Sequence, residues 1–308
     1  MKRVHQTGRD GVLVINKPSG PSSNQCLDRL KHGLDQPGLG HAGTLDPLAD
    51  GVLVVLLGQA TKLSPYLMEG YKIYTGRLRL GISTDTFDAL GQVMAEKPWQ
   101  HLSLERINAE IDHWTTLAEQ EVPAYSAAKY KGKPLYKMTR EGKETPIKIK
   151  SINIAQAEVL ETDPPWVRFR VRCSSGTYIR SLVHSLGMRL ECGATLTGLT
   201  RNCSYPFGLE QAVDLDQILA EPESLPDYLI PMEKALPDWP KVSVNKDQAE
   251  KILNGMEIRC IDALGQQTGQ RAMLLRRDGD RDEPLALAEF KLKGELPVWS
   301  ILRGLWSA

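Results

Sequence analysis

The spacing of hydrophobic residues predicts several strands in the first third of the chain. Residues 11–17 (GVLVINK) form a short, β-branched run that ends at a Pro-Ser-Gly turn, and residues 72–80 alternate between apolar and polar side chains. The unbroken apolar run at residues 52–57 is typical of a fully buried strand. Glycine and proline punctuate residues 38–50, so we expect that segment to be a loop.

Further along the chain the patterns predict helices and a pair of strands. Ser22 and Ser23 are suitable N-caps for a helix, because apolar residues follow them at helical spacing. Residues 147–160 and 166–173 are predicted to be paired strands. Helices are predicted to include residues 26–34, 104–114 and 177–190.

The character of the sequence changes after Asp214. The chain becomes acidic and is spaced by prolines as far as Pro240, which predicts a connection across a domain boundary. Residues 241–308 are predicted to form short strands around one helix at residues 246–253. We therefore expect a mixed α/β (α+β) fold, with a mainly antiparallel sheet in residues 1–238 and a small β-rich module in residues 239–308.

The overall composition is ordinary, but the charge is unevenly distributed. The 308 residues are 41% hydrophobic and 25% charged, with a formal net charge of zero. Residues 129–150 hold eight Lys or Arg against two Glu, whereas residues 210–238 hold eight acidic residues against one Lys. Tyr130 and Tyr136 interleave with the lysines, as in many RNA-binding segments, although a solvated loop has the same composition.

The sequence disfavours several classes of protein. No apolar run approaches the roughly 18 residues that span a bilayer, and no apolar stretch follows the basic N-terminus as in a secretory signal. Neither a dinucleotide fingerprint nor a P-loop is present. The five cysteines show no CxxC spacing, so a disulfide framework is not expected and a reducing cytoplasm is predicted.

Asp46 is the strongest candidate for chemistry, because it lies in a glycine-rich loop directly before a buried run. Pro47 disfavours a helical conformation at Asp46. A carboxylate held against apolar surface tends to protonate unless a cation faces it. Our candidate cation is Arg180, since a guanidinium at about 4 Å contributes roughly 4 kcal/mol at an effective dielectric near 20. Such a pair leaves an oriented carboxylate that can act as a nucleophile or a base.

Other interpretations of these residues remain open. A loop aspartate commonly forms an Asx-turn or caps a helix. His41, Asp46 and Asp50 are near one another in sequence, but their spacing matches no recognised metal-ligand pattern. Tyr74 and Tyr178 are candidates for presenting a ring to a cleft, although aromatic side chains at such positions commonly serve packing alone.

Six segments together resemble the TruB family of tRNA pseudouridine synthases over most of the first 210 residues. GVLVINKPSGPSSN, which contains Lys17, is similar to the N-terminal motif, and GHAGTLDPLADGVLVVLLGQATK is similar to the catalytic motif, which places the catalytic aspartate on Asp46. The last 70 or so residues are loosely similar to a PUA-type RNA-binding module, most closely at ILNGMEIR. The other similar segments are YKIYTGRLRLGISTDTFDALG, VPAYSAAKYKGKPLYKMTREG, RCSSGTYIRSLVHSLG and GATLTGLTRNCSYPF.

The resemblance implies a fold, a reaction and a set of roles. It implies a pseudouridine synthase catalytic domain that isomerises uridine to pseudouridine at position 55 of the tRNA T-loop, after the base is flipped to Asp46. Arg180 is expected to orient Asp46, and Tyr74 to stack on the uracil. Residues expected to bind substrate or RNA are His41, Lys17, Tyr178, Leu199, Lys129, Lys131 and Lys133. The T-arm stem-loop of tRNA is the expected partner, with no cofactor, metal, membrane or obligatory protein partner.

Three alternative hypotheses lead to different experiments. An RNA-binding or tRNA-folding protein would keep its role when Asp46 is replaced. A metal-dependent phosphoesterase using His41, Asp46 and Asp50 would lose activity with a chelator. A guide-RNA-dependent uridine isomerase would be inactive without partner proteins.

Overall fold

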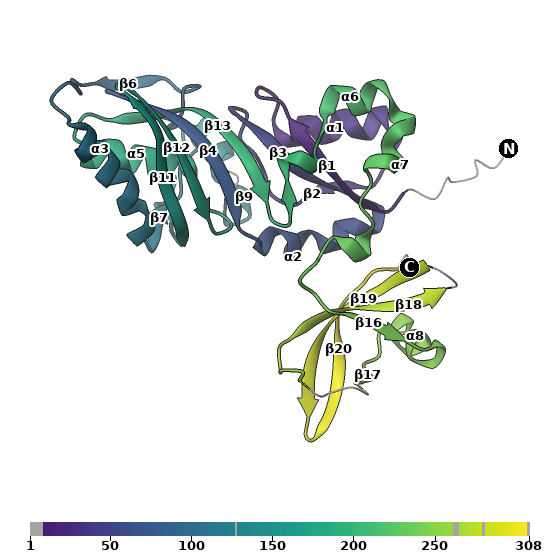
Figure 1. The fold of residues 1–308 in the computed structure, drawn as a ribbon. Coiled ribbons are helices and arrows are strands. Elements are labelled where there is room, and N and C mark those ends of the chain that lie inside the picture. The colour runs from purple at the N-terminus through teal and green to yellow at the C-terminus, as the bar shows by residue number, and fades with distance from the viewer. Residues whose placement is uncertain (1–8, 127, 261–264, 279–280, 307–308) are drawn as a thin grey trace.

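Two main sheets from different parts of the chain organise the fold (Figure 1). The computed structural model describes residues 9–126, 128–260, 265–278 and 281–306, so most of the basic N-terminal stretch lies outside the described residues. The strands of a nine-stranded sheet lie in residues 11–214, and those of a five-stranded sheet lie in residues 241–304.

The nine-stranded sheet is mainly antiparallel, as predicted. Its order is β11-β12-β4-β13-β3-β1-β15, with β14 paired to β13 and β2 paired to β3. Only the β3–β13 and β1–β15 pairs are parallel among the described strands of this sheet. Its strands are β1 (Gly11–Lys17), β2 (Leu39–His41), β3 (Ala49–Leu57), β4 (Lys72–Leu80), β11 (Ile154–Asp163), β12 (Trp166–Cys173), β13 (Ala194–Ser204), β14 (Phe207–Gly208) and β15 (Val213–Asp214).

Helices and three short strand pairs surround this sheet. The strand pairs are β5 (Ile82–Thr84) with β6 (Val93–Glu96), β7 (Glu119–Glu121) with β10 (Ile149–Ser151), and β8 (Lys129–Tyr130) with β9 (Lys133–Pro134). The helices of this part are α1 (Ser23–Gly33), α2 (Ser64–Glu69), α3 (Leu104–Asp112), α4 (Leu135–Arg140), α5 (Ile179–Arg189), α6 (Leu215–Ala220) and α7 (Leu225–Tyr228), whereas α8 (Lys246–Leu253) packs against the second sheet. Ser22 caps α1 in a capping box with Gln25, which confirms the predicted helix start.

The second sheet packs against the first through a shared hydrophobic cluster. Val12 and Leu56 of the large sheet contribute to the same buried cluster as Met273 and Leu287 of the small one. We propose that the domain boundary lies at residue 238, in the connection between the two sheets. The strands of the second sheet, in the order β16-β18-β19-β20-β17, are β16 (Lys241–Val244), β17 (Ile258–Arg259), β18 (Arg271–Asp278), β19 (Arg281–Lys293) and β20 (Leu296–Gly304).

Two of the predicted elements are wrong in extent. Residues 38–50 are not all loop, because β2 pairs with β3 and the ladder overrides the low strand propensity of glycine. Residues 147–160 are not one strand, since β10 pairs with β7 and only β11 pairs with β12. The partner changes where Ile152 donates its N–H to Ala118 and Asn153 bonds to Ser174.

Strands β4 and β12 alternate between a buried and an exposed face, and Phe169 anchors the buried one. Its ring is fully buried, lies edge-on to Trp114 at 5.0 Å, and fills the space beside Gly76, where a Cβ would lie 2.3 Å from the ring. This packing fixes β4 against β12 and so places the neighbouring Tyr74.

We expect Phe169→Ala to lower the free energy of unfolding by about 3–5 kcal/mol, because it leaves a cavity under β4. Urea denaturation measures the change. Arg168→Ala is the matched control, since Arg168 is exposed on the opposite face of the same strand. Equal effects of the two substitutions would contradict the assignment of the buried face.

Candidate active site

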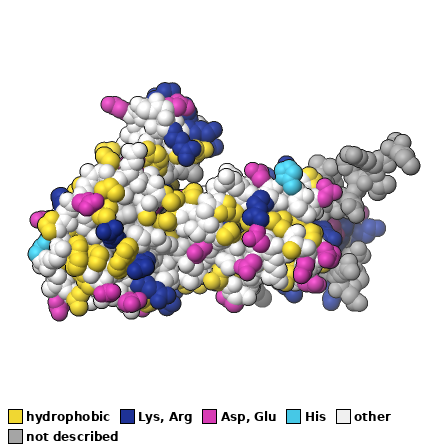
Figure 2. Space-filling model, turned by 90° about the horizontal axis from the view of Figure 1, so that it is seen from above, with side chains coloured by type: hydrophobic (Ala, Val, Ile, Leu, Met, Phe, Trp, Pro, Cys, Tyr) yellow, Lys and Arg dark blue, Asp and Glu magenta, His cyan; other side chains and the backbone are white. Residues whose placement is uncertain are grey.

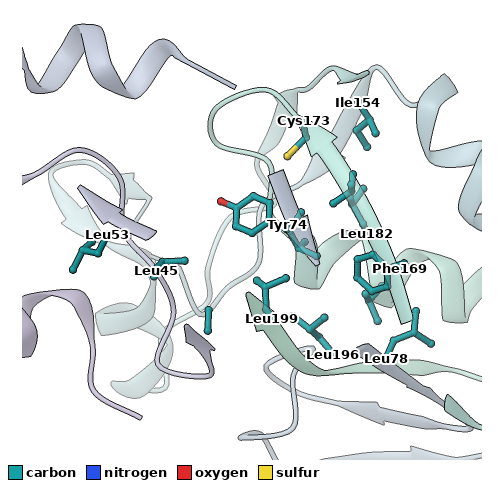
Figure 3. Close-up of a cluster of buried hydrophobic side chains, with 14 of the residues drawn as sticks. Leu45, Leu53, Tyr74, Leu78, Ile154, Phe169, Cys173, Leu182, Leu196 and Leu199 are labelled. Carbon is teal, nitrogen blue, oxygen red and sulfur yellow. The ribbon is translucent and has the colours of Figure 1, made fainter. Parts of the chain in front are cut away.

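A cleft of about 410 Å³ opens beside the loop that carries Asp46. It lies where this loop meets β4, β13 and the start of α5. Figure 3 shows Tyr74 beside Leu199, with the tyrosine oxygen turned to the side on which Leu45 lies. Residues that line the cleft include Asp46, Lys72, Tyr74, Tyr178, Leu199 and Arg201.

The loop of residues 42–48, called the Asp46 loop below, is held in place by bonds to its backbone. Ser23 Oγ donates to Leu45 O at 3.0 Å and accepts from Leu45 N at 2.8 Å, and Ser23 is buried. On the other side of Asp46, Gly20 N donates to Pro47 O at 2.8 Å. The backbone on both sides of the carboxylate is therefore fixed, which restricts the positions that its side chain can take.

The predicted pair of Asp46 and Arg180 is confirmed. Arg180 Nε lies 2.8 Å from Asp46 Oδ2, and Arg180 Nη2 lies 3.3 Å from Asp46 Oδ1. This is a two-point contact, which fixes the orientation of the carboxylate as well as its charge. The side chain of Arg180 is 4% exposed and that of Asp46 is 38% exposed, so the carboxylate faces the cleft from a buried base.

The remaining donors of Arg180 are also used. Nη1 donates to Thr86 O at 2.9 Å, and Nη2 donates to Tyr125 O at 3.0 Å. A second carboxylate, that of Asp88, lies 3.6 Å from Nη1 and is 7% exposed. Thr86 Oγ1 donates to Asp88 at 2.7 Å, which holds this second acid beside the guanidinium. Arg180 is thus fixed from four sides, and its charge is shared between two acids.

Tyr74 and Leu199 form an apolar wall of the cleft. Tyr74 is 9% exposed and Leu199 is 8% exposed, and both point from neighbouring strands of the large sheet. Burial raises the pKa of Tyr74, and the positive charge of Arg201 opposes that rise. A phenol and a branched alkyl group at one surface are suited to contact a planar, partly polar ring.

Comparisons with known proteins identify the family of this chain. A model described as TruB family pseudouridylate synthase (N terminal domain) matches residues 31–179. The chain is similar to tRNA pseudouridine synthase B of Oleidesulfovibrio alaskensis, with 54% identity over 96% of each chain. It is similar to the protein of that name from Nitratidesulfovibrio vulgaris, with 53% identity over 96% of this chain and 97% of the relative. The chain belongs to the TruB family.

Solved structures confirm the predicted fold class. The chain is similar to a chain in a structure of an H/ACA RNP bound to a substrate RNA containing 2'-deoxyuridine, with a TM-score of 0.69 and 23% identity. It is also similar to a chain in a Cbf5-Nop10-Gar1 complex, with a TM-score of 0.70 and 25% identity. In both cases the match covers 96% of this chain and 85% of the other. The TruB membership confirms the predicted enzyme class, a pseudouridine synthase.

Two residues predicted to bind substrate or RNA lie elsewhere than expected. Lys17 is fully buried, and its ammonium donates to the carbonyls of Pro18 and Pro21 at 2.8 Å each, so its position argues against contact with RNA. His41 ends β2 and does not line the cleft; its buried Nδ1 atom has no hydrogen-bond partner among the described residues. Burial lowers the pKa of His41, which favours the neutral ring. Tyr178, in contrast, lines the cleft at the start of α5.

The three predicted lysines form a short hairpin outside the lining of the cleft. Lys129 and Lys131 are exposed, and Lys133 is held by an ion pair with Glu141 at 2.5 Å. Lys150, from the same basic stretch, is exposed and lines the cleft. Figure 2 shows basic and acidic side chains interspersed over one face of the molecule.

Metal and membrane hypotheses gain no support from the described part of the chain. There, no group of three or more His, Cys, Asp or Glu is placed to hold a metal ion, so His41, Asp46 and Asp50 do not form a ligand set. No helix within the same residues has the length and apolar character needed to cross a membrane.

Sequence reasoning missed three residues that shape this site: Lys72, Asp88 and Arg201. For Lys72 and Arg201, the alternation of inward and outward side chains along a strand could have indicated their place in the site. Lys72 is two residues from Tyr74, and Arg201 is two residues from Leu199, so each shares an inward face with a predicted site residue. Asp88 follows a turn and carried no comparable signal.

The buried ammonium of Lys72 gives a test by pH. Burial lowers the pKa of Lys72 from 10.5 to about 8. In the unfolded chain the pKa of Lys72 returns to its ordinary value, so between pH 8 and 10.5 the unfolded state binds one more proton than the folded state. The free energy of unfolding therefore increases as the pH rises through this window. As the pH rises from 8 to 10.5, the free energy of unfolding of the parent should increase by up to about 3 kcal/mol relative to that of Lys72→Met. Urea denaturation at each pH measures the difference. A constant difference across the window would contradict the desolvation of this group.

Proposed function

We propose that this chain isomerises uridine to pseudouridine at position 55 in the T-loop of tRNA. The observation that carries the proposal is the carboxylate of Asp46, held at two points by buried Arg180 and facing a cleft walled by Tyr74 and Leu199. The relatives named tRNA pseudouridine synthase B support tRNA as the substrate.

The reaction requires only bond exchange within one nucleotide. The N1–C1′ bond breaks, the uracil rotates, and C5 bonds to C1′; C5 then loses its proton and N1 gains one. A carboxylate can assist by forming a covalent bond either to C1′ of the sugar or to C6 of the base, and it leaves again at the end. Asp46 is the nucleophile in this proposal, and Arg180 positions it. Both routes need the same carboxylate in the same orientation.

The target base reaches Asp46 only when it leaves the RNA stack. Extrusion costs a few kcal/mol, which contacts to the flipped base and the backbone offset. In the proposed complex the uracil stacks on Tyr74 and packs against Leu199, and the phenolate form of Tyr74 takes the proton released from C5. Tyr178 closes the same cleft from the start of α5.

RNA backbone contacts are assigned to the basic stretch. Lys129 and Lys131 are exposed near the hairpin turn, and Lys150 extends the basic surface to the cleft. We propose that these ammonium groups bind phosphates of the T-arm, while Lys133 stays engaged with Glu141. No partner protein is required in this proposal, and the purified chain is expected to act on a T-arm stem-loop. The described cysteines are free thiols, which suits the proposed cytoplasmic location.

Replacement of Asp46 tests the catalytic assignment. We expect Asp46→Asn to reduce pseudouridine formation on an unmodified T-arm stem-loop by at least about 10³-fold, because the nucleophile is removed. RNA affinity should stay within a few-fold of the parent. Asp50→Asn is the matched control, since Asp50 is close in sequence but does not line the cleft.

Retained turnover in Asp46→Asn would refute the assignment. The same variant also addresses the alternative function as an RNA-folding protein. Cells that carry only Asp46→Asn should lose pseudouridine at the target position. Growth of these cells reports separately on a role in RNA folding, which does not need Asp46.

The salt dependence of binding tests the lysines. We expect the double change Lys129→Ala and Lys131→Ala to reduce the slope of log K against log salt by about 1 to 2, roughly 0.7–0.9 for each phosphate that the protein no longer neutralises. Fluorescence anisotropy with a labelled T-arm measures it. Lys31→Ala, an exposed lysine of α1, should leave the slope unchanged. An unchanged slope in the double variant would contradict the assigned phosphate binding.

A further inference from the structure

Arg201 is a buried cation whose positive charge has no acidic partner in the described part of the chain. It is 1% exposed, and among the described residues no carboxylate lies within ion-pair distance of it. Buried charges are costly unless they are paired, so a guanidinium without an acid partner calls for a function.

The hydrogen bonds of Arg201 to the backbone all go to carbonyls around the Asp46 loop. Nη2 donates to Gly43 O at 3.1 Å, Nη1 to Thr44 O at 3.3 Å, and Nε to Val52 O at 2.7 Å. Strands β3 and β13 approach so closely at Gly51 and Arg201 that a Cβ on Gly51 would lie 2.4 Å from Arg201 O. Gly51 also has a φ of +94°, which favours glycine. Arg201 therefore fixes the two ends of the segment that carries Asp46.

The same residue sits beside Tyr74. Arg201 and Tyr74 are register partners on β13 and β4, and both line the cleft. The charged or titratable groups that face the phenol are Arg201, Cys173 and Asp46, with Lys72 two residues away on the same strand. Asp46 and Cys173 disfavour a negative phenolate, whereas Arg201 favours it. The guanidinium is the group that opposes the rise that burial causes in the pKa of the phenol.

We propose that Arg201 is a positioning residue that joins the two halves of the site: it clamps the Asp46 loop and supplies the positive charge that lets Tyr74 accept the proton from C5. This inference rests on the proposed function. In the step it supports, Tyr74 first loses its phenol proton to solvent; the phenolate oxygen then bonds to the proton of C5, the C5–H electron pair returns to the ring, and N1 takes up one proton from solvent. No oxidant or further reactant is needed.

Two measurements separate the charge from the clamp. The first places a fluorinated tyrosine at position 74 and follows the absorbance of its phenolate against pH without RNA. Arg201→Met should raise the pKa of this phenol relative to the Arg201 parent, and Arg201→Lys, which keeps the charge, should reverse most of the rise. An unchanged titration in Arg201→Met would overturn the electrostatic role. Because no turnover is measured, this result stands apart from any failure of the proposed function.

The second measurement is a double-mutant cycle in single-turnover kinetics on the T-arm stem-loop. Arg201→Met should lower the rate by about 10²-fold, the usual contribution of a proton-transfer group, and by clearly less in a Tyr74→Phe background, where only the clamp on the Asp46 loop remains to be lost. Equal decreases in both backgrounds would overturn the coupling to Tyr74. If Arg201→Met does not fold, Arg201→Lys carries the cycle. Lysine keeps the charge but not the three-point clamp, so the decrease should be the same in both backgrounds, and a decrease confined to the Tyr74 background would overturn the role of the charge.

Discussion

The two-point ion pair between Asp46 and Arg180 is the interaction on which the site depends. Charge alone would hold a carboxylate near a cation in many orientations, but two parallel hydrogen bonds select one. The cost of burying the guanidinium is offset because two acids and two carbonyls surround it. The partly exposed carboxylate is the only member of this group turned to the cleft among those described here. Orientation of the acid is thus built into the folded chain before any substrate arrives.

The large sheet explains how residues far apart in sequence reach this point. Asp46 precedes β3, Tyr74 lies on β4, Leu199 and Arg201 lie on β13, and Arg180 lies in the first turn of α5. Parallel pairing of β13 with β3 brings Leu199 opposite Ala49, three residues from Asp46, while antiparallel pairing of β13 with β4 brings Arg201 opposite Tyr74. One strand therefore sets the position of both the carboxylate loop and the phenol. A shift of its register would separate them.

Much of this arrangement could be predicted from local chemistry. Pro47 and the surrounding glycines indicate a loop with non-helical backbone at Asp46, and the apolar run that follows indicates a buried strand. The cost of an unpaired carboxylate predicts a cation beside Asp46, for which Arg180 was the candidate. The predictions failed where contacts in the folded chain determine the burial of a side chain. Lys17 was predicted to bind substrate or RNA, yet it is fully buried and donates to two carbonyls. The strand β2 likewise forms only because β3 offers a partner, and Asp88 joins the site only through the turn that follows β5.

The orientation of Asp46 by Arg180 is tested most directly by the rate of the chemical step in Arg180→Lys. Lysine keeps the positive charge but cannot bind the carboxylate at two points. In single-turnover reactions on an unmodified T-arm stem-loop, the account predicts a fall in rate of at least about 10²-fold with RNA affinity nearly unchanged. A rate within a few-fold of the parent would show that charge alone suffices and would contradict the account.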